Sequence, residues 1–172
     1  MNWNTLTQEV GYWAEHNFTV FAPQFGFGEE IGEFTHIILK QKQGIRGYGD
    51  ASKVRVDCID AIGDATIYLA HWCYLHCPTN VQLPTSFTEY GDLGYPLGKL
   101  YHIAAELIDY DRVVEGEDRL PCEIATSALA ELTDLAASHG WRLMEDCVVP
   151  TWEIVKKRNW RVSPISGTTL PD

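Results

Sequence analysis

The segment from about Ser52 to Cys77 constrains the fold more than any other part of the sequence. Ser52 is expected to cap its start, and Pro78 ends it, because proline disfavours helical geometry in the preceding residue. Its apolar residues surround the predicted helix more fully than a single stripe does: Ile59, Ile62, Ile67, Leu69 and Trp72. A helix that is apolar on several sides lies at the centre of a fold. We therefore expect the other elements to pack around this one.

Helical periodicity accounts for most of the remaining sequence, because apolar residues recur at three- and four-residue steps. Asn4 or Thr5 is expected to cap the first helix. Gly44 and Gly140 are expected to end two others, and Pro150 predicts a break in the last. The expected helices span residues 3–17, about 26–43, about 52–77, about 97–114, about 121–139 and about 143–158. The sequence thus predicts an all-α fold, a helical bundle of about six helices.

The connections between these helices differ in character. Residues 18–28 contain proline and glycine among aromatics and predict an ordered loop packed on the core. Residues 78–96 predict a long loop with turn chemistry at both ends, and residues 115–119 a solvated turn. We expect residues 1–160 to form a single domain. Residues 161–172 are rich in Ser, Thr, Pro and Gly and predict a poorly ordered tail.

Composition narrows the classes of function. The net charge of −11 argues against a nucleic-acid polymer as the main partner, because such binding needs a Lys/Arg surface. The longest apolar runs are too short to cross a bilayer, and the N-terminus lacks the pattern of a signal peptide. We therefore expect a cytoplasmic protein without a membrane partner, whose five cysteines are free thiols. Cys58, Cys73 and Cys77 are expected to pack as small apolar residues.

Two acidic runs lie inside helical patterns and next to apolar residues. In the first, Glu30 and Glu33 project together and Glu29 joins Glu33 at a spacing of four. In the second, one row is formed by Asp57, Asp60 and Asp64. Charges are seldom buried unless they are paired or bind a metal. Antiparallel packing of the two helices would gather these carboxylates, and hard divalent cations such as Mg²⁺ prefer oxygen ligands.

These residues resemble the MazG-like family of the all-α nucleoside-triphosphate pyrophosphatase superfamily. The family pattern is Glu-Glu-x-x-Glu on one helix and Glu-x-x-Asp on the next. Residues 29–33 match the first half, and residues 60–64 with the apolar run that follows look like the second. Ala61 stands where the family has Glu, so Asp60 is assigned the missing role, with Asp57 as its competitor. Residues 152–160 also resemble a segment of several family members.

The resemblance implies an activity, the Mg²⁺-dependent hydrolysis of a nucleoside triphosphate to the monophosphate and pyrophosphate by metal-activated water. The implied ligands of Mg²⁺, or of Mn²⁺, are Glu30, Glu33, Asp60 and Asp64. The implied catalytic residues are Glu29, Glu30 and Glu33, with Glu29 as a further ligand or as the group that orients or deprotonates the water. Candidates for phosphate contact are Lys53, Arg55, Lys156, Lys157 and Arg158, and candidates for stacking on the base are Trp13 and Trp160. One two-helix wall leaves apolar surface uncovered, so we expect a four-helix core completed in a homodimer or higher homo-oligomer.

Other interpretations compete with this one. The acidic run 29–33 is also typical of a helix start, where it complements the dipole, and residues 156–158 are typical of a solvated helix end. Glu33 and His36 form one Glu-x-x-His element of a di-iron helical-bundle oxidase, but that fold needs two, and residues 102–106 have the wrong order and spacing. The His and Cys residues of 71–77 spread across several helix faces, which disfavours zinc. Ala61 leaves a third alternative, a non-catalytic helical interaction protein.

Overall fold

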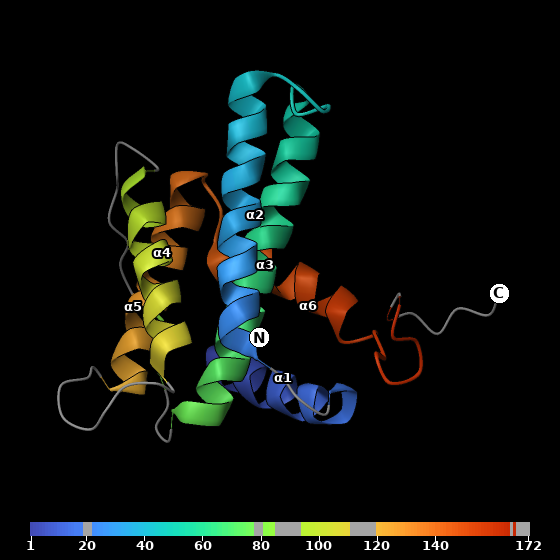
Figure 1. The fold of residues 1–172 in the computed structure, drawn as a ribbon, viewed down its shortest axis with the longest axis vertical. Helices are drawn as coiled ribbons and strands as arrows, with labels where there is room; N and C mark the ends of the chain where they lie inside the picture. Colours follow the sequence, from blue (N-terminus) through green and yellow to red (C-terminus); the bar gives the residue numbers. More distant parts are fainter. Residues whose placement is uncertain (19–21, 78–80, 85–93, 111–119, 166, 168–172) are drawn as a thin grey trace.

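The structure, a computed structural model, describes residues 1–18, 22–77, 81–84, 94–110, 120–165 and 167 (Figure 1). Its elements are α1 (Trp3–Asn17), α2 (Pro23–Gln43), α3 (Ala51–His76), α4 (Gly94–Asp109), α5 (Pro121–Ser138), the π-helical turn η2 (Leu143–Val148) and α6 (Val149–Val155). No strand occurs within these ranges. The prediction of an all-α fold is confirmed.

Helix α3 lies at the centre of the fold, as its apolar pattern predicts. It packs against α1, α2, α5, η2 and α6. Its side chains Ile62, Leu69 and Trp72 are almost completely buried. Figure 1 shows α2 and α3 side by side as a long pair, with α1 across one end, α4 and α5 on one side and α6 on the other. None of the described helices is both long and apolar enough to span a membrane.

Helices α2, α3, α5 and α4 form a closed four-helix arrangement in which each packs against two of the others. Buried Leu100, Leu107 and Leu129 belong to the α4–α5 half of this core. Much of the apolar surface of the α2–α3 pair is therefore covered within one chain. The sequence left open whether residues 97–140 or a second subunit supplies that cover. The homodimer stays a prediction, since the structure contains a single chain.

Two helices begin with other caps than the sequence predicts. The side chain of Asn2, rather than Asn4 or Thr5, caps α1 by accepting a hydrogen bond from the Thr5 backbone N–H at 2.9 Å. Asp50, rather than Ser52, caps α3, because its Oδ1 accepts from the Ser52 backbone N–H at 2.8 Å and from the Ser52 hydroxyl at 2.7 Å. Both corrections move the cap two or three residues upstream to a side chain that favours this position equally well.

The start of α2 corrects the predicted loop at residues 18–28. The helix begins at Pro23, which lies in its first turn where the absent N–H costs nothing; residues 19–21 lie outside the described chain. Gly26 belongs to the helix rather than to a turn. A Cβ atom at Gly26 would overlap the ring of Tyr68 on α3. The glycine therefore permits close contact between the two helices.

Other predicted boundaries fall partly outside the described residues. Within the predicted loop 78–96, helix α4 already begins at Gly94, and Pro96 is buried in its first turn. The fourth helix is described as far as Asp109 rather than Val114. The predicted turn at residues 115–119 lies outside the described residues.

The last helical segment changes type just before Pro150. Residues of η2 form a π-helical turn, and Pro150 occupies the first turn of α6. The wide turn meets α3 at Gly63, where an added Cβ would lie 2.9 Å from the carbonyl oxygen of Cys147 and would overlap Thr151. Gly63 thereby lets η2 and α6 pack directly beside Asp64.

The described part of the C-terminal tail forms hydrogen bonds within itself and with α1. The backbone N–H of Asn159 donates to the Gly167 carbonyl at 2.6 Å, and that of Gly167 donates to the Ser163 carbonyl at 2.7 Å. Arg161 Nη2 donates to the Glu15 carbonyl at 3.0 Å. These bonds join Asn159, Ser163 and Gly167 to one another and Arg161 to the end of α1; residues 166 and 168–172 lie outside the described chain.

Candidate functional site

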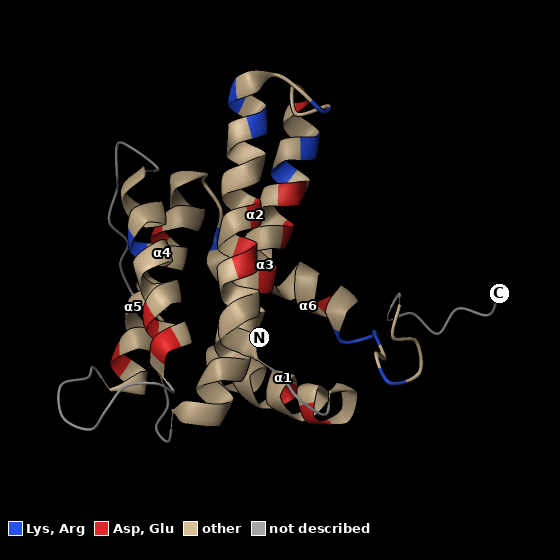
Figure 2. Ribbon diagram, in the orientation of Figure 1, with Lys and Arg blue, Asp and Glu red and all other residues tan. Residues whose placement is uncertain are grey.

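Carboxylates from α2 and α3 meet along the middle of this helix pair. Figure 2 shows acidic residues there and basic residues at the far end, where the two helices connect. Glu30 and Asp64 are half-buried, and both line a cavity of about 290 Å³. Glu29, Glu33 and Asp60 are exposed beside them. Two of the predicted carboxylates therefore share one cavity, and the other three lie at its margin.

The electrostatics of the pair confirm how close these carboxylates lie. Burial, followed by the negative charges of Asp64, Glu33, Glu29 and Asp60, raises the pKa of Glu30 to about 8. Burial also raises the pKa of Asp64 to about 7, with the charge of Asp60 as the next cause. The pKa of Asp60 is raised by burial as well. Such repulsion is relieved by protons or by a cation.

Aromatic and apolar side chains form the other walls of the cavity. They come from α1, α3, α6 and the segment after α6: Val10, Trp13, Phe18, Ile67, Tyr68, Val155 and Trp160. The Trp13 ring meets Phe18 and Trp152 edge-on, at centroid distances of 5.6 and 5.8 Å. These contacts hold Trp13 in a fixed orientation. The cavity thus pairs an acidic wall with an aromatic one.

Arg158 is the one described cation in the cavity lining. Its positive charge lowers the pKa of Asp60 and of Asp64, in opposition to their burial. Its guanidinium carbon lies 5.9 Å from the Trp160 ring centroid, within cation–π range. The cavity therefore offers carboxylates for a cation and a guanidinium for an anion within the same space.

Hydrogen bonds between the two ends of the chain build this part of the site. The Trp13 indole N–H donates to the Arg158 carbonyl at 3.2 Å. The Trp160 backbone N–H donates to Asn17 Oδ1 at 2.8 Å, and the Trp152 indole N–H donates to Glu9 Oε2 at 2.9 Å. Together with the close packing at Gly63, these bonds place the residues after α6 over the carboxylates of α2 and α3.

Asp60 and Asp57 are the two candidates for the ligand role of the Glu that the MazG-like pattern has at position 61. The structure places them in different surroundings. Ala61 itself is buried in the core. Asp60 acts electrostatically on both Glu30 and Asp64. Asp57 pairs with Lys53 at 2.5 Å, and hydrogen bonds from Lys53 and Tyr48 lower its pKa. Asp60 is thus the residue that belongs with the cavity.

The remaining predicted cations lie elsewhere. Lys53 is committed to Asp57 and lies 4.5 Å from the Tyr48 ring centroid. Arg55 lies over the Trp141 ring at 5.7 Å. Lys156 pairs with Glu153, and neither it nor the exposed Lys157 is part of the cavity lining. Of the five cations considered for phosphate contact, the structure brings Arg158 to the carboxylates.

Two aromatic lining residues, Tyr68 and Phe18, were missed by sequence reasoning. Tyr68 follows Asp64 by four positions on α3, so helical spacing could have found it. Burial, followed by the charge of Glu30, raises its pKa to about 12, which keeps the phenol protonated. Phe18 comes directly after α1 and has no periodic signal, because its place depends on the contact with Trp13.

The donor chemistry suits a hard cation, although the carboxylates do not form a ready-made cage. Among the described residues no group of three or more His, Cys, Asp or Glu side chains is placed to hold a metal ion. Mg²⁺ commonly takes only one or two carboxylates and completes its shell with water and substrate phosphate. Glu30 and Asp64 meet that requirement. His36 and His102 are not part of the cavity lining, and His102 lies 3.9 Å from Glu106 on its own helix.

Similarity searches supply no relative for this chain: no family model, no curated protein and no solved structure matches it. The function is therefore argued from the cavity and from the pattern of residues 29–33 and 60–64.

Proposed function

We propose that the chain is a Mg²⁺-dependent nucleoside-triphosphate pyrophosphohydrolase that releases the monophosphate and pyrophosphate. The observation that carries the proposal is the composition of one cavity, in which Glu30 and Asp64 face Arg158, Trp13 and Trp160. A nucleotide carries the complementary groups: a polyphosphate for cation and guanidinium, and a flat base for aromatic rings. The MazG-like pattern of the carboxylates supports the same activity.

Each residue has a defined task in this proposal. Glu30 and Asp64 would hold Mg²⁺, and Glu33 and Asp60 would add oxygen ligands from the rim. Bound Mg²⁺ would neutralise the phosphate charge and lower the pKa of the attacking water. Glu29, which is exposed beside Glu30, orients that water or accepts its proton.

The aromatic wall and Arg158 position the substrate. The Arg158 guanidinium donates hydrogen bonds to phosphate oxygens, a role that its planar group performs well. Trp13 and Trp160 stack on the base, and the buried rings around them exclude water. Lys53 and Lys156 take no part, because each is paired with a carboxylate outside the cavity. A homodimer and a cytoplasmic setting stay predictions beside this proposal.

The experiment is a pyrophosphate-release assay with a panel of NTPs and dNTPs plus Mg²⁺, with the monophosphate identified by chromatography. Glu33→Gln and Asp64→Asn should each abolish release while circular dichroism shows intact helices. Asp57→Asn is the matched control and should retain activity. Absence of release from every nucleotide at high enzyme concentration would overturn the proposal. Visible absorbance with bound iron would favour the di-iron oxidase instead. If the chain shows neither pyrophosphate release nor iron binding, the non-catalytic interaction protein is the remaining alternative.

A further inference from the structure

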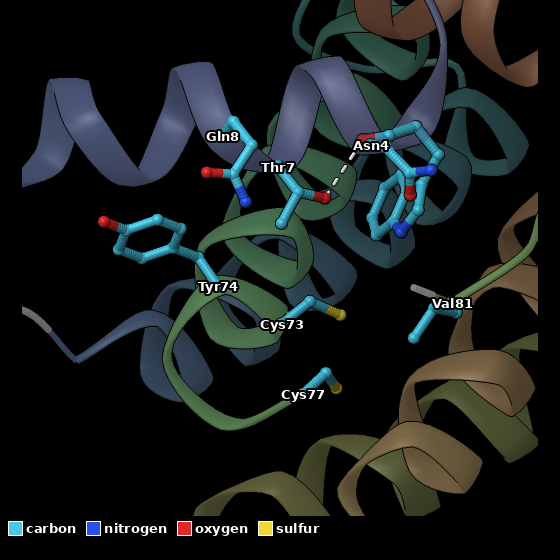
Figure 3. A pocket seen from close by; sticks show the side chains of 8 residues that line it. Asn4, Thr7, Gln8, Cys73, Tyr74, Cys77 and Val81 are labelled. Carbon is cyan, nitrogen blue, oxygen red and sulfur yellow. Dashed lines mark hydrogen bonds between the residues drawn. The ribbon is translucent and has the colours of Figure 1, made fainter. Parts of the chain in front are cut away.

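Three thiols meet where α3 ends and α5 begins, away from the carboxylate cavity. Cys73 lies in the last turn of α3, Cys77 follows that helix directly, and Cys122 lies in the first turn of α5. The thiols of Cys73 and Cys122 both lie close enough to Cys77 to influence its pKa. Figure 3 shows the sulfur atoms of Cys73 and Cys77 pointing to the same side, toward Val81. The protein therefore contains a thiol cluster that joins two helices.

The cluster is open to small molecules. Cys73 and Cys77 line a pocket of about 100 Å³ together with polar residues of α1, namely Asn4, Thr7 and Gln8 (Figure 3). Cys77 and Cys122 are half-buried. Cys58 and Cys147 differ, because both are buried and burial raises the pKa of each thiol to about 12. A reagent of the size of a peroxide thus has a path to Cys77 but not to Cys58 or Cys147.

Within the cluster, Cys77 is more exposed than Cys73 and is the thiol whose ionisation is favoured. The hydrogen bond from Cys73 lowers the pKa of Cys77, and the bond from Cys122 lowers it further, against the effect of burial. The pKa of Cys73 rises because it donates to Cys77 and is almost completely buried. Nucleophilic attack requires the thiolate, so the cluster concentrates reactivity on one sulfur.

We propose that Cys77 is a hydroperoxide-reactive thiol whose oxidation ends in a disulfide with Cys122. In the first step the Cys77 thiolate attacks the peroxide, an S–O bond forms, the O–O bond breaks and hydroxide or alkoxide leaves. In the second step the Cys122 sulfur attacks the Cys77 sulfenic acid, the S–S bond forms, and water leaves with the thiol proton. The two thiols lose two electrons and the peroxide gains them.

Cys122 is favoured over Cys73 as the partner because of backbone geometry. Cys77 has left the helix and has an extended backbone, with φ of −100° and ψ of 102°, so its side chain is not confined to the helical direction. Cys73 remains inside α3 and on the same turn of chain, which constrains the Cβ positions that a disulfide needs. A disulfide to Cys122 would also close a long loop of the chain, and disulfides that close long loops stabilise a fold most.

The test uses the full reduced chain treated with hydrogen peroxide, followed by alkylation of the remaining thiols. Chymotrypsin cleaves after Tyr74 and so separates Cys73 from Cys77, which lets mass spectrometry identify the bonded pair. We expect a Cys77–Cys122 cross-linked peptide that dithiothreitol removes, and a melting temperature higher by about 5 °C in the oxidised protein. Before oxidation, Cys77 should alkylate about tenfold faster than Cys58.

Variants separate the two steps. Cys122→Ser should stop at the first step, so that dimedone labels Cys77 and no cross-link forms, whereas Cys77→Ser should give neither product. Cys73→Ala should still form the cross-link. A Cys73–Cys77 disulfide as the main product, or dimedone on another cysteine, would overturn the proposal. Unchanged thiols in the wild-type chain, at a peroxide concentration that oxidises a small free thiol, would do so as well.

Discussion

Glu30 on α2 and Asp64 on α3 face the same cavity, and the negative charge of Asp64 raises the pKa of Glu30. When both half-buried carboxylates are ionised, their repulsion destabilises the folded chain. Arg158 offsets part of the repulsion on Asp64. A cation bound at these carboxylates would relieve the repulsion between them, so the repulsion favours cation binding.

The first prediction concerns Glu30→Gln in the absence of metal. The folded pKa of about 8 lies above the ordinary value of 4.5, so between these values the folded state holds a proton that the unfolded state releases. Stability therefore falls as pH rises through this window. Glu30→Gln removes this loss and should stabilise the chain by about 1 kcal/mol at about pH 8 and by little at about pH 4.

Urea unfolding with a chelator present measures the difference at each pH. Glu145→Gln is the control, because Glu145 is exposed in η2 and outside the cavity. Its effect should stay within about 0.5 kcal/mol at both pH values. A Glu30→Gln variant that is less stable than the wild type at the higher pH would refute the proposed repulsion.

The second prediction assigns the ligand role that Ala61 leaves open. Mg²⁺ that binds only the folded state raises the melting temperature in proportion to its occupancy. Asp60→Asn should reduce the shift that Mg²⁺ produces, because Asp60 acts on the Glu30–Asp64 pair. Asp57→Asn should keep the shift, because Asp57 is engaged by Lys53; the loss of this largely exposed pair should cost less than about 1 kcal/mol. Thermal melts with and without Mg²⁺ decide whether Asp60 or Asp57 is the ligand. A reduced shift in Asp57→Asn beside a normal shift in Asp60→Asn would assign the ligand role to Asp57.

Sequence periodicity identified the helices but not all of their ends. The central helix α3 was predictable because its apolar residues surround it, and Gly44 and Pro121 mark helix ends by local chemistry. The caps were not, because Asn2 and Asp50 compete with neighbours that have a similar preference. Gly26 lies where the predicted loop 18–28 and the predicted helix 26–43 overlap, and the sequence did not show that its absent side chain serves the contact with Tyr68. A single sequence carries no signal that separates these two uses of glycine.

Some residues of the candidate site were predictable from the sequence, and others were not. Glu30 and Asp64 follow from helical spacing and from their apolar surroundings. Trp13, Arg158 and Trp160 were chosen for their chemistry, and the structure brings them to the same cavity. Contacts between distant segments could not be deduced, so Phe18 was missed. Lys53 was a candidate for phosphate contact, whereas the structure pairs it with Asp57 outside the cavity lining. The contact of Cys77 with Cys122 is long-range as well, and the sequence predicted only small apolar packing for Cys77.

The third prediction tests how η2 and α6 are seated on α3. Gly63→Ala places a methyl group against Thr151 and the Cys147 carbonyl, so the two segments must move apart. The expected cost is about 1–3 kcal/mol of unfolding free energy, with a loss of activity because Arg158 moves away from Asp64. Gly32→Ala is the matched control, since no atom lies within 4 Å of its added Cβ. This change should stabilise α2 by about 0.5–1 kcal/mol, and denaturant unfolding of both variants measures the opposite signs.

The fourth prediction compares neighbouring cations after α6. Arg158→Gln removes the guanidinium from the cavity, and kcat/KM for a nucleoside triphosphate should fall about 100-fold. Lys157→Gln alters an exposed residue outside the lining and should change kcat/KM by less than about twofold.

Arg158 also lowers the pKa of Asp60 and Asp64. Its removal should therefore raise the pH at which Mg²⁺ begins to stabilise the chain, because protons then compete more strongly for both carboxylates. Melting curves across a pH series measure this shift without any substrate, so the electrostatic role is separable from phosphate binding. An unchanged pH dependence in Arg158→Gln, beside a normal one in Lys157→Gln, would contradict the placement of the guanidinium next to these carboxylates.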